Sequence, residues 1–379
     1  MSKIVVAGAN GYTGRLVAAE LRTRGVSVQL AVRRPEAGQS LLTDLGHPPM
    51  FTTTTFEAHR GSSPVPGLAA GDVVINCIGP YALTGPGIID SAIRGKAHYL
   101  DAAGESGFLR EVFAGSHAAA RAAGTVVAPG FGFESVPGHL AAARAVQAAG
   151  DSATGVEIFY SCDPRAASHG TVNSAVRATQ EPAHRLTGGV LLPEELGARR
   201  RVWPIAGRRY HGVSIGTTEA LALPRAFPRL REVSSYLGAP GGLGRVFSAT
   251  ARAGVSAARN ELGRRLIDTL EERTRHRPAS RSTRPARTVV AARASNSEGR
   301  PLQEVRFAGA DPYALTAHLL ACAGVALLSR PQLPSGVLGP LEVFDANELE
   351  GLLAQRRMCR LPCSVDDLAE PVLTHASRL

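Results

Sequence analysis

The sequence predicts an α/β protein that begins with a doubly wound parallel sheet and continues into a second α/β or α+β domain. Two observations carry this prediction. Short β-branched runs alternate with helical patterns from Lys3 to about Gly150, as a parallel sheet covered on both faces requires. Beyond Gly150 the pattern changes to alternating segments interrupted by Gly, Arg and Pro, which indicates a second domain in a chain of 379 residues.

Strand and helix signals follow one another regularly in the first half. The apolar run KIVVA predicts a buried first strand, and the helix after it is closed by Gly25. A strand is also expected at 48–55, where the signal is weak. The clear strands of this half are predicted at 3–7, 28–32, 72–77, 97–100 and 125–128, and its helices at 15–24 and 87–94.

The second half begins with a helix that ends near Ala149, after which alternating segments are interrupted by Gly, Arg and Pro. A flexible loop is expected at 279–287, where Ser, Arg and Pro are concentrated. The chain closes with helical patterns at 312–329 and 346–356. Strands or strand-like pieces are predicted at 156–160, 202–205, 220–223, 288–294 and 304–307.

Composition argues against several classes of function. The formal net charge is +10, but 40 of the 42 basic residues are Arg spread along the chain. The stretch with the most arginines, 245–300, has no aromatic residue besides Phe247 that could stack on a base. We therefore expect no nucleic-acid partner. The five cysteines are scattered and odd in number, so we expect neither a disulfide framework nor a metal site. The longest apolar run, 314–328, is short and carries His318, and the N-terminus does not resemble a secretory signal. We therefore expect a cytoplasmic protein with no integral membrane segment.

A glycine-rich turn directly follows the first strand. It reads GANGYTG at residues 8–14 and opens a helix. In this position the helix N-terminus and backbone N–H groups can hold a pyrophosphate, and glycine lets the backbone turn tightly beside it. The spacing G-x-x-G-x-x-G differs from the usual G-x-G-x-x-G, but its place after the first strand predicts a dinucleotide site.

The end of the second strand predicts which dinucleotide binds. An acidic residue there would bond the ribose 2′-hydroxyl, whereas this chain has Arg33 and Arg34. Guanidinium groups suit a 2′-phosphate in charge and in geometry, so we expect NADP(H). The alternative is two solvated arginines beside Glu36.

Two further strand ends carry polar residues. In the sequence INCIGPY at 75–81, Gly79 and Pro80 would let the backbone pass close to a nicotinamide ribose, and Tyr81 would point toward a substrate. A strand-to-helix turn with a packed Tyr81 and no ligand explains this sequence equally well. Asp101 and Glu105 follow the next strand and could orient cofactor or substrate, or cap the helix from Ser106.

A third glycine-rich stretch, PGFGFESVPGH at 129–139, connects the two halves of the chain. Ser135 and His139 in it could donate protons to a substrate. The G-x-S-x-G elbow and the residue orders of hydrolase triads are absent, so the sequence does not support a hydrolase.

Taken together, five segments resemble the saccharopine dehydrogenase-like family of NADP-dependent reductases, particularly its actinobacterial trans-acting enoyl reductase branch. They occur in one order and cover residues 1–145 well. The segments are GANGYTG, RRPE, INCIGPYALTG, HYLDAAGE and PGFGFESVPGHL. The middle of the chain, 151–309, matches only in fragments such as HGTVNS at 169–174.

The resemblance implies a domain organisation and a set of site residues. It implies an NADP-binding Rossmann domain at 1–138, a substrate and dimerisation domain at 139–309, and a helical segment at 310–379 that packs back on the first domain, in a homodimer. The pyrophosphate would be held by Gly8, Asn10, Gly11, Tyr12, Thr13 and Gly14; the 2′-phosphate by Arg33 and Arg34; and the nicotinamide side by Cys77, Gly79, Pro80 and Asp101. Tyr81 and Asp101 fall where relatives meet an amino-acid substrate, and further substrate contacts are expected from Ser135, Arg165, His169 and Arg177.

Two functions remain open. The first is an NADPH-dependent reductase that transfers hydride to a C=C or C=N bond of a small acyl or amino-acid-like substrate, with Tyr81, Glu105 or His139 as proton donor. An acyl thioester or a carrier-bound acyl group is consistent with this function. The second is a redox sensor that binds NADP without catalysis. The size of the second domain favours the reductase.

Overall fold

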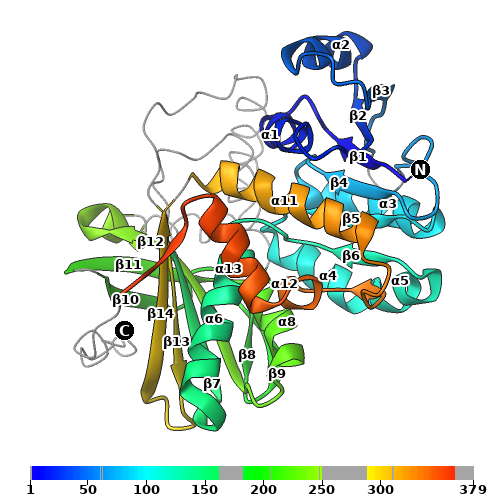
Figure 1. The fold of residues 1–379 in the computed structure, drawn as a ribbon. Helices are drawn as coiled ribbons and strands as arrows, with labels where there is room; N and C mark the ends of the chain where they lie inside the picture. The colour runs from blue at the N-terminus through cyan, green and yellow to red at the C-terminus, as the bar shows by residue number, and fades with distance from the viewer. Residues whose placement is uncertain are drawn as a thin grey trace, which may run out of the picture. The chain divides into compact units, whose positions relative to one another are not determined.

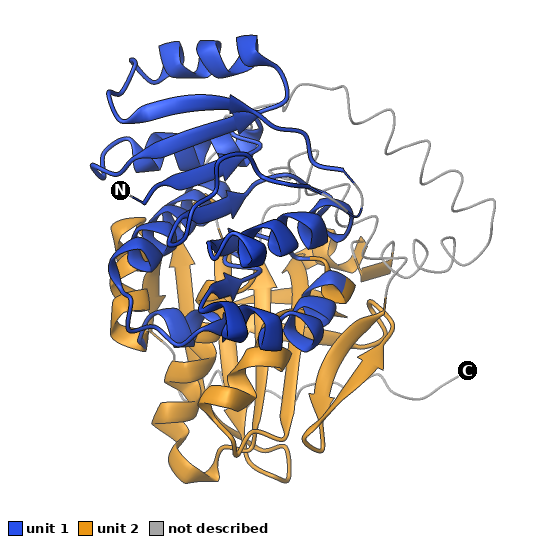
Figure 2. Cartoon of the chain, turned by 90° about the vertical axis from the view of Figure 1, so that its right-hand side faces the viewer, with its two compact units in different colours: residues 1–104, 108–133, 313–345 blue, residues 105–107, 134–312, 346–379 orange. Residues whose placement is uncertain are grey.

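The chain folds into two compact units, each built around its own sheet (Figures 1 and 2). The structure is a computed structural model that describes residues 2–59, 61, 63–161, 182–205, 207–246, 248–249, 288–309 and 311–362. Unit 1 comprises residues 1–104, 108–133 and 313–345, and unit 2 comprises residues 105–107, 134–312 and 346–379. The chain passes from unit 1 to unit 2 after Phe133, inside the third glycine-rich stretch.

Unit 1 contains a seven-stranded sheet in which each strand pairs in parallel with its neighbours. The order β3-β2-β1-β4-β5-β6 is that of a doubly wound dinucleotide-binding sheet, with β15 added at the edge. This confirms the predicted fold class. The strands are β1 (Ile4–Ala7), β2 (Val28–Val32), β3 (Phe51–Thr55), β4 (Val73–Asn76), β5 (His98–Asp101), β6 (Val126–Ala128) and β15 (Gly336–Val337).

Apolar strands and amphipathic helices explain how unit 1 forms its core. Strands β1, β4 and β6 are buried along their whole length, as expected for a parallel sheet with helices on both faces. The weak strand signal at 48–55 corresponds to β3, an edge strand rich in Thr. The helices are α1 (Tyr12–Leu21), α2 (Pro35–Asp44), α3 (Tyr81–Arg94), α4 (Ser106–Gly115), α5 (His117–Ala123), α11 (Pro312–Ser329) and α12 (Pro340–Val343).

Helix α11 packs directly on the sheet of unit 1. A Cβ on Gly324 would lie 3.2 Å from Cδ1 of Ile4 and 3.0 Å from Cδ1 of Ile75, so glycine permits a close approach to β1 and β4. Of the described helices, α11 alone is long and apolar enough to cross a membrane by length and composition, and 61% of it is buried in the fold. Its bounds agree with the helical pattern predicted at 312–329.

Unit 2 is a mixed sheet with helix α6 (Val136–Ala149) packed across β7, β13 and β14. The main strand order is β10-β11-β12-β7-β13-β14-β16, while β8 pairs with β12 and β9. Only the β12–β7 pair is parallel among the described pairs of this sheet. The strands are β7 (Gly155–Ser161), β8 (Ala183–Thr187), β9 (Val190–Glu194), β10 (Arg200–Ile205), β11 (Arg208–Ile215), β12 (Glu232–Pro240), β13 (Thr288–Ser295), β14 (Pro301–Gly309) and β16 (Cys359–Leu361).

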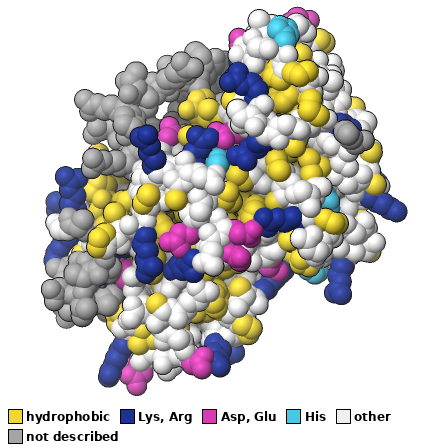
Figure 3. Space-filling view, in the orientation of Figure 1, with side chains coloured by type: hydrophobic (Ala, Val, Ile, Leu, Met, Phe, Trp, Pro, Cys, Tyr) yellow, Lys and Arg dark blue, Asp and Glu magenta, His cyan; other side chains and the backbone are white. Residues whose placement is uncertain are grey.

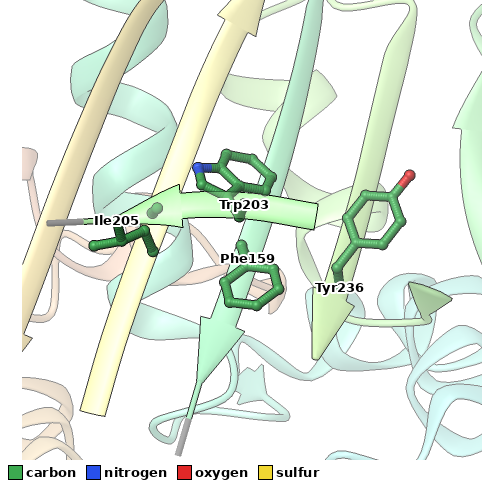
Figure 4. Close-up of a cluster of buried hydrophobic side chains, with 5 residues drawn as sticks. Phe159, Trp203, Ile205 and Tyr236 are labelled. Carbon is green, nitrogen blue, oxygen red and sulfur yellow. The ribbon is translucent and has the colours of Figure 1, made fainter. Parts of the chain in front are cut away.

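An aromatic cluster closes one face of this sheet (Figure 4). Trp203 and Ile205 come from β10, and Figure 4 shows their strand crossing the strand that carries Phe159. Phe159 and Trp203 have ring centroids 5.6 Å apart, and the guanidinium carbon of Arg293 lies 4.8 Å from the Trp203 ring centre. Strand β10 therefore folds back over the sheet and covers its core.

Two expectations differ from the structure. Residues 220–223, predicted as a strand-like piece, lie in helix α8 (Glu219–Ala226). The run Ala220 to Leu223 consists of good helix formers, and a short apolar run does not distinguish a buried strand from a buried helix. The closing segment is also divided: residues 313–345 belong to unit 1, whereas α13 (Ala346–Gln355) belongs to unit 2 and packs against α6.

The charge of the surface is mixed where it can be seen. On the face drawn in Figure 3, Lys and Arg side chains are interspersed with Asp and Glu. The loop expected at 279–287 and most of the Arg-rich stretch 245–300 lie outside the described residues.

Candidate functional site

The glycine loop after β1 is shaped by contacts that leave no room for a side chain at Gly8 or Gly14. Gly8 has φ +76°, and a Cβ there would lie 2.7 Å from Cγ1 of Ile78. A Cβ on Gly14 would lie 2.8 Å from Cα of Ala9 and even closer to the carbonyl oxygen of Gly8. The Gly11 N–H donates to that same Gly8 carbonyl at 2.9 Å. At the carboxyl end of β1, the loop therefore presents backbone rather than side chains at its glycine positions, and we call it the phosphate cradle.

Helix α1 starts from this cradle without a side-chain cap. Its N-cap residue is Gly11, and its first turn contains Tyr12, Thr13 and Gly14. The first N–H groups of a helix have no acceptor within the helix and carry partial positive charge, which suits a pyrophosphate. Asn10 contributes a backbone carbonyl that accepts from Nε of Arg15 at 3.1 Å. The geometry fits the phosphate-binding role predicted for residues 8–14.

Arg33 and Arg34 lie at the end of β2, and both side chains are exposed. Arg34 is the N-cap residue of α2, and Glu36 lies in the first turn of that helix. Within the described part of the chain, neither guanidinium group forms a hydrogen bond or an ion pair, with Glu36 or with any other residue; the Arg34 backbone carbonyl accepts from the Ala37 N–H at 3.1 Å. Two guanidinium groups thus remain available for a 2′-phosphate, as the sequence predicts.

A buried hydrogen-bond network links the loops that follow β4, β5 and β6. Asn76 accepts from the Ile78 N–H at 3.0 Å and donates to the Tyr99 hydroxyl at 3.1 Å. The Tyr99 hydroxyl donates to Oδ2 of Asp101 at 2.6 Å. Oδ1 of Asp101 accepts from the N–H groups of Ala103 at 2.9 Å and Gly130 at 2.7 Å. Asp101, predicted to contact the cofactor, is here the group that holds three loops together.

The loop after β4 contains Cys77, Gly79 and Pro80, and the Gly79–Pro80 peptide is cis. Burial, and secondarily the charge of Asp101, raises the pKa of the Cys77 thiol to about 12, so the side chain stays neutral. Tyr81 is half-buried at the start of α3, and its ring stacks on Phe108 with centroids 6.4 Å apart. These residues lie at the sheet edge where open α/β sheets bind ligands.

The residues of unit 2 that the sequence predicts as proton donors or substrate contacts are buried where the structure describes them. Glu105 and Ser135 are 2% and 3% exposed, and the His139 side chain is fully buried in α6. Nδ1 of His139 lies 3.0 Å from the carbonyl oxygen of Ser135, so the ring proton sits on Nδ1 and donates to that oxygen. Burial lowers the pKa of His139 to about 4. A neutral His139 has no proton on Nε2 to give, which argues against the predicted proton-donor role.

Sequence reasoning did not single out Tyr160 or Glu219, which lie beside the start of α6. The Tyr160 hydroxyl donates to Oε1 of Glu219, and both side chains are completely buried. The pKa of Glu219 is raised to about 7, and burial is the largest cause of this shift. Tyr160 belongs to a predicted strand and Glu219 precedes an apolar run, so no local pattern marks either residue. Only the packing of β7, α6 and α8 brings them together.

Lowering the pH should destabilise the protein through His139. Its pKa is about 4 in the folded state and near 6.5 in the unfolded state, so the unfolded chain takes up the proton first. The stabilisation by neutral His139 is complete above pH 6.5 and is lost as the pH falls toward 4, by up to about 3 kcal/mol. Urea unfolding at several pH values should show this slope in the wild type and lose it in His139→Gln. The exposed His47→Asn is the control, and parallel curves for wild type and His139→Gln would contradict the assignment.

Three predicted substrate residues, Arg165, His169 and Arg177, lie outside the described residues. Within the described chain, no group of three or more His, Cys, Asp or Glu side chains could hold a metal ion.

Part of the chain is similar in sequence to known oxidoreductases. Residues 4–128 match the saccharopine dehydrogenase NADP-binding domain. Saccharopine dehydrogenase-like oxidoreductases of Mus musculus and Homo sapiens are 26% and 28% identical over 171 residues, 41% of this chain. The matched region covers 40% of the length of each of these two relatives.

A bacterial relative matches over a longer region. A proposed trans-acting enoyl reductase of Mycobacterium tuberculosis is 27% identical over 214 residues, which cover 53% of this chain and 51% of that protein. Among solved structures, the apo saccharopine dehydrogenase (L-Glu forming) of Saccharomyces cerevisiae has a TM-score of 0.62 at 14% identity, covering 95% of this chain and 99% of that one. The structural likeness supports the fold.

Proposed function

We propose that this chain, whose residues 4–128 match the saccharopine dehydrogenase NADP-binding domain, is an oxidoreductase that uses NADPH to reduce the C=C bond of an enoyl thioester. The observation that carries the proposal is the nucleotide site of unit 1. A turn in which Gly8 and Gly14 have no room for a side chain precedes α1. Arg33 and Arg34, whose guanidinium groups pair with no described residue, follow β2. The first of these features suits a pyrophosphate, and the second suits the 2′-phosphate that distinguishes NADP from NAD.

The residues of unit 1 bind and orient, while the bound cofactor supplies hydride when it is reduced. In this proposal, Gly8 and Gly14 let the backbone approach the pyrophosphate, and Cys77, Gly79 and Pro80 line the nicotinamide side. The network of Asn76, Tyr99 and Asp101 keeps the surrounding loops in place. The neutral Cys77 thiol adds no negative charge beside the site. The half-buried Tyr81 would face the substrate.

Two observations favour an enoyl thioester over an imine. The Mycobacterium tuberculosis relative named as a proposed enoyl reductase matches more of this chain than the mammalian relatives do. Unit 2 also contains an open hollow of about 630 Å³ that is lined by three arginines, Arg208, Arg209 and Arg245, together with His211, Pro240 and Gly241. Such a lining would attract the phosphate groups that enoyl thioester carriers bear.

Removing both guanidinium groups should change which nucleotide binds. We expect the double variant Arg33→Ala, Arg34→Ala to weaken NADPH binding about 10- to 100-fold, because charge-assisted hydrogen bonds to a phosphate are lost. NADH binding should change little, since NADH has no 2′-phosphate. Fluorescence titration with both nucleotides measures this, and Arg110→Ala, an exposed arginine of α4, is the matched control.

The reaction is tested by stopped-flow oxidation of bound NADPH with enoyl thioesters, cyclic imines, and pairs of a 2-oxo acid and an amine. Turnover of an enoyl thioester would support the proposal. Turnover of an imine alone would move the reaction to C=N bonds. Tight NADPH binding without oxidation by any acceptor would contradict a reductase and support the redox-sensor alternative.

A further inference from the structure

The open hollow of unit 2 lies where strands β11 and β12 meet the helical residues 241–246, and we call it the arginine hollow. Strands β11 and β12 are antiparallel neighbours, so the start of β11 lies beside the end of β12. A Cβ on Gly244 would lie 3.0 Å from the carbonyl oxygen of His211 and closer to that of Ala239, so glycine lets the helical residues pack tightly on both strands. The lining residues are Arg208, Arg209 and His211 of β11, Pro240 of β12, and Gly241 and Arg245 of the helical residues.

No acidic side chain lines the arginine hollow. The guanidinium groups of Arg208 and Arg245 form no hydrogen bond or ion pair with any residue that the structure describes. The pKa of His211 is lowered by its partial burial and then by the charges of Arg245 and Arg209, so these two guanidinium groups act on the same ring. Guanidinium groups that gather without an acid attract phosphate groups.

Two exposed apolar side chains stand beside the hollow, on the helical residues 241–246. Leu243 is 48% exposed and Val246 is 61% exposed. Residues three apart in a helix lie on the same face, and we call this pair the apolar face. Arg245 lies between the two in sequence and lines the hollow. Exposed apolar side chains beside cationic ones are typical of proteins that bind at the interface of an anionic membrane.

Two other kinds of partner would fit this surface only in part. A soluble phosphate-bearing molecule, such as the thioester carrier considered above, would meet the arginines but leave Leu243 and Val246 in water. A specific protein interface buries about 800 Å² on each partner around an apolar centre. Among the described residues of β11, β12 and 241–246, Leu243 and Val246 are the only exposed large hydrophobic side chains, which is too small a centre for such an interface.

We propose that the arginine hollow and the apolar face together dock the protein on a membrane surface that contains anionic phospholipid. Arg208, Arg209 and Arg245 bind lipid phosphates, while Leu243 and Val246 enter the boundary between headgroups and acyl chains. Because much of the attraction is between charges at the surface, the association weakens as salt screens the arginines. The inference concerns unit 2 alone and does not rest on the reaction proposed above.

Co-sedimentation of the full chain with vesicles tests the charged part of this surface. The protein should bind vesicles of phosphatidylcholine mixed with phosphatidylglycerol, dissociate at high salt, and not bind vesicles of phosphatidylcholine alone. The double variant Arg208→Gln, Arg245→Gln should bind the mixed vesicles about 30-fold more weakly. The control Arg110→Gln, Arg300→Gln removes two exposed arginines elsewhere and lowers the net charge equally, so it should weaken binding much less.

The apolar part of the surface is tested separately. Leu243→Ser, Val246→Ser should weaken binding to the mixed vesicles about 10-fold without changing its salt dependence, because the lost contacts are apolar. Val190→Ser, Leu192→Ser, in an exposed apolar pair of β9, should bind as wild type does. The emission of Leu243→Trp should be quenched by lipids brominated in their acyl chains, whereas Trp203, the one tryptophan of the chain, is buried and should not respond. Thermal unfolding checks that each variant keeps its fold.

Three results would overturn the inference. If anionic vesicles do not bind, while inorganic pyrophosphate binds in a manner that depends on Arg208 and Arg245, the hollow is a site for a soluble phosphate. If the arginine double variant and its control lose binding equally, the attraction comes from the net charge of +10 and not from this surface. If brominated lipids do not quench Leu243→Trp, the apolar face stays outside the bilayer.

Discussion

Gly14→Ala should weaken NADPH binding at least about 100-fold, which corresponds to about 3 kcal/mol of binding free energy. The added Cβ would lie 2.8 Å from Cα of Ala9 and closer to the carbonyl oxygen of Gly8. Both contacts are with backbone, so no side-chain rotation can relieve them. The start of α1 must move away from β1, and the phosphate cradle opens. Titration with NADPH and NADH measures the effect, which should be similar for both because the pyrophosphate is common to them.

Gly115→Ala is the matched control within unit 1. A Cβ on Gly115, at the end of α4, meets no atom within 4 Å, so folding and NADPH binding should stay at wild-type levels. Thermal unfolding of both variants distinguishes loss of the site from loss of the fold. A folded Gly14→Ala protein that binds NADPH as tightly as wild type would place the pyrophosphate elsewhere.

Asp101→Ala should destabilise the protein by roughly 3 to 6 kcal/mol. The carboxylate accepts hydrogen bonds from the Tyr99 hydroxyl and from the N–H groups of Ala103 and Gly130, all of them buried. Each buried donor left without an acceptor costs about 1–3 kcal/mol. Because these donors belong to the loops after β5 and β6, NADPH binding should weaken as well. Denaturant unfolding gives the first quantity and nucleotide titration the second.

Tyr99→Phe shows whether the cost depends on the number of donors. It removes one donor to Asp101 and one acceptor for Asn76 while leaving both backbone bonds of Asp101 in place. The loss of stability should therefore be smaller, about 1–2 kcal/mol. Equal stability losses in the two variants would indicate that the backbone bonds to Asp101 contribute nothing.

The parallel sheet could be predicted because its signals are local. The buried strands β1 and β4 are short β-branched runs, and the turn of residues 8–14 must contain glycine for the backbone to fold beside β1. The same reasoning misassigned residues 220–223, since a four-residue apolar run has no periodicity that separates a strand from the helix α8. It also did not anticipate that α13 would pack with α6 in unit 2, because the partner of a helix is set by contacts distant in sequence.

The predicted nucleotide site and the buried Tyr160–Glu219 pair show what can be predicted from the sequence and what is set only by tertiary packing. A dinucleotide site at Gly8, Gly14, Arg33 and Arg34 could be predicted from the sequence alone, because binding a dinucleotide requires particular residue types at fixed distances from the first two strands. Tyr160 and Glu219 are 59 residues apart in sequence and occupy no motif. Only the packing of β7, α6 and α8 removes water from the carboxyl group and aligns the tyrosine hydroxyl with it, and it is this burial that raises the Glu219 pKa toward 7.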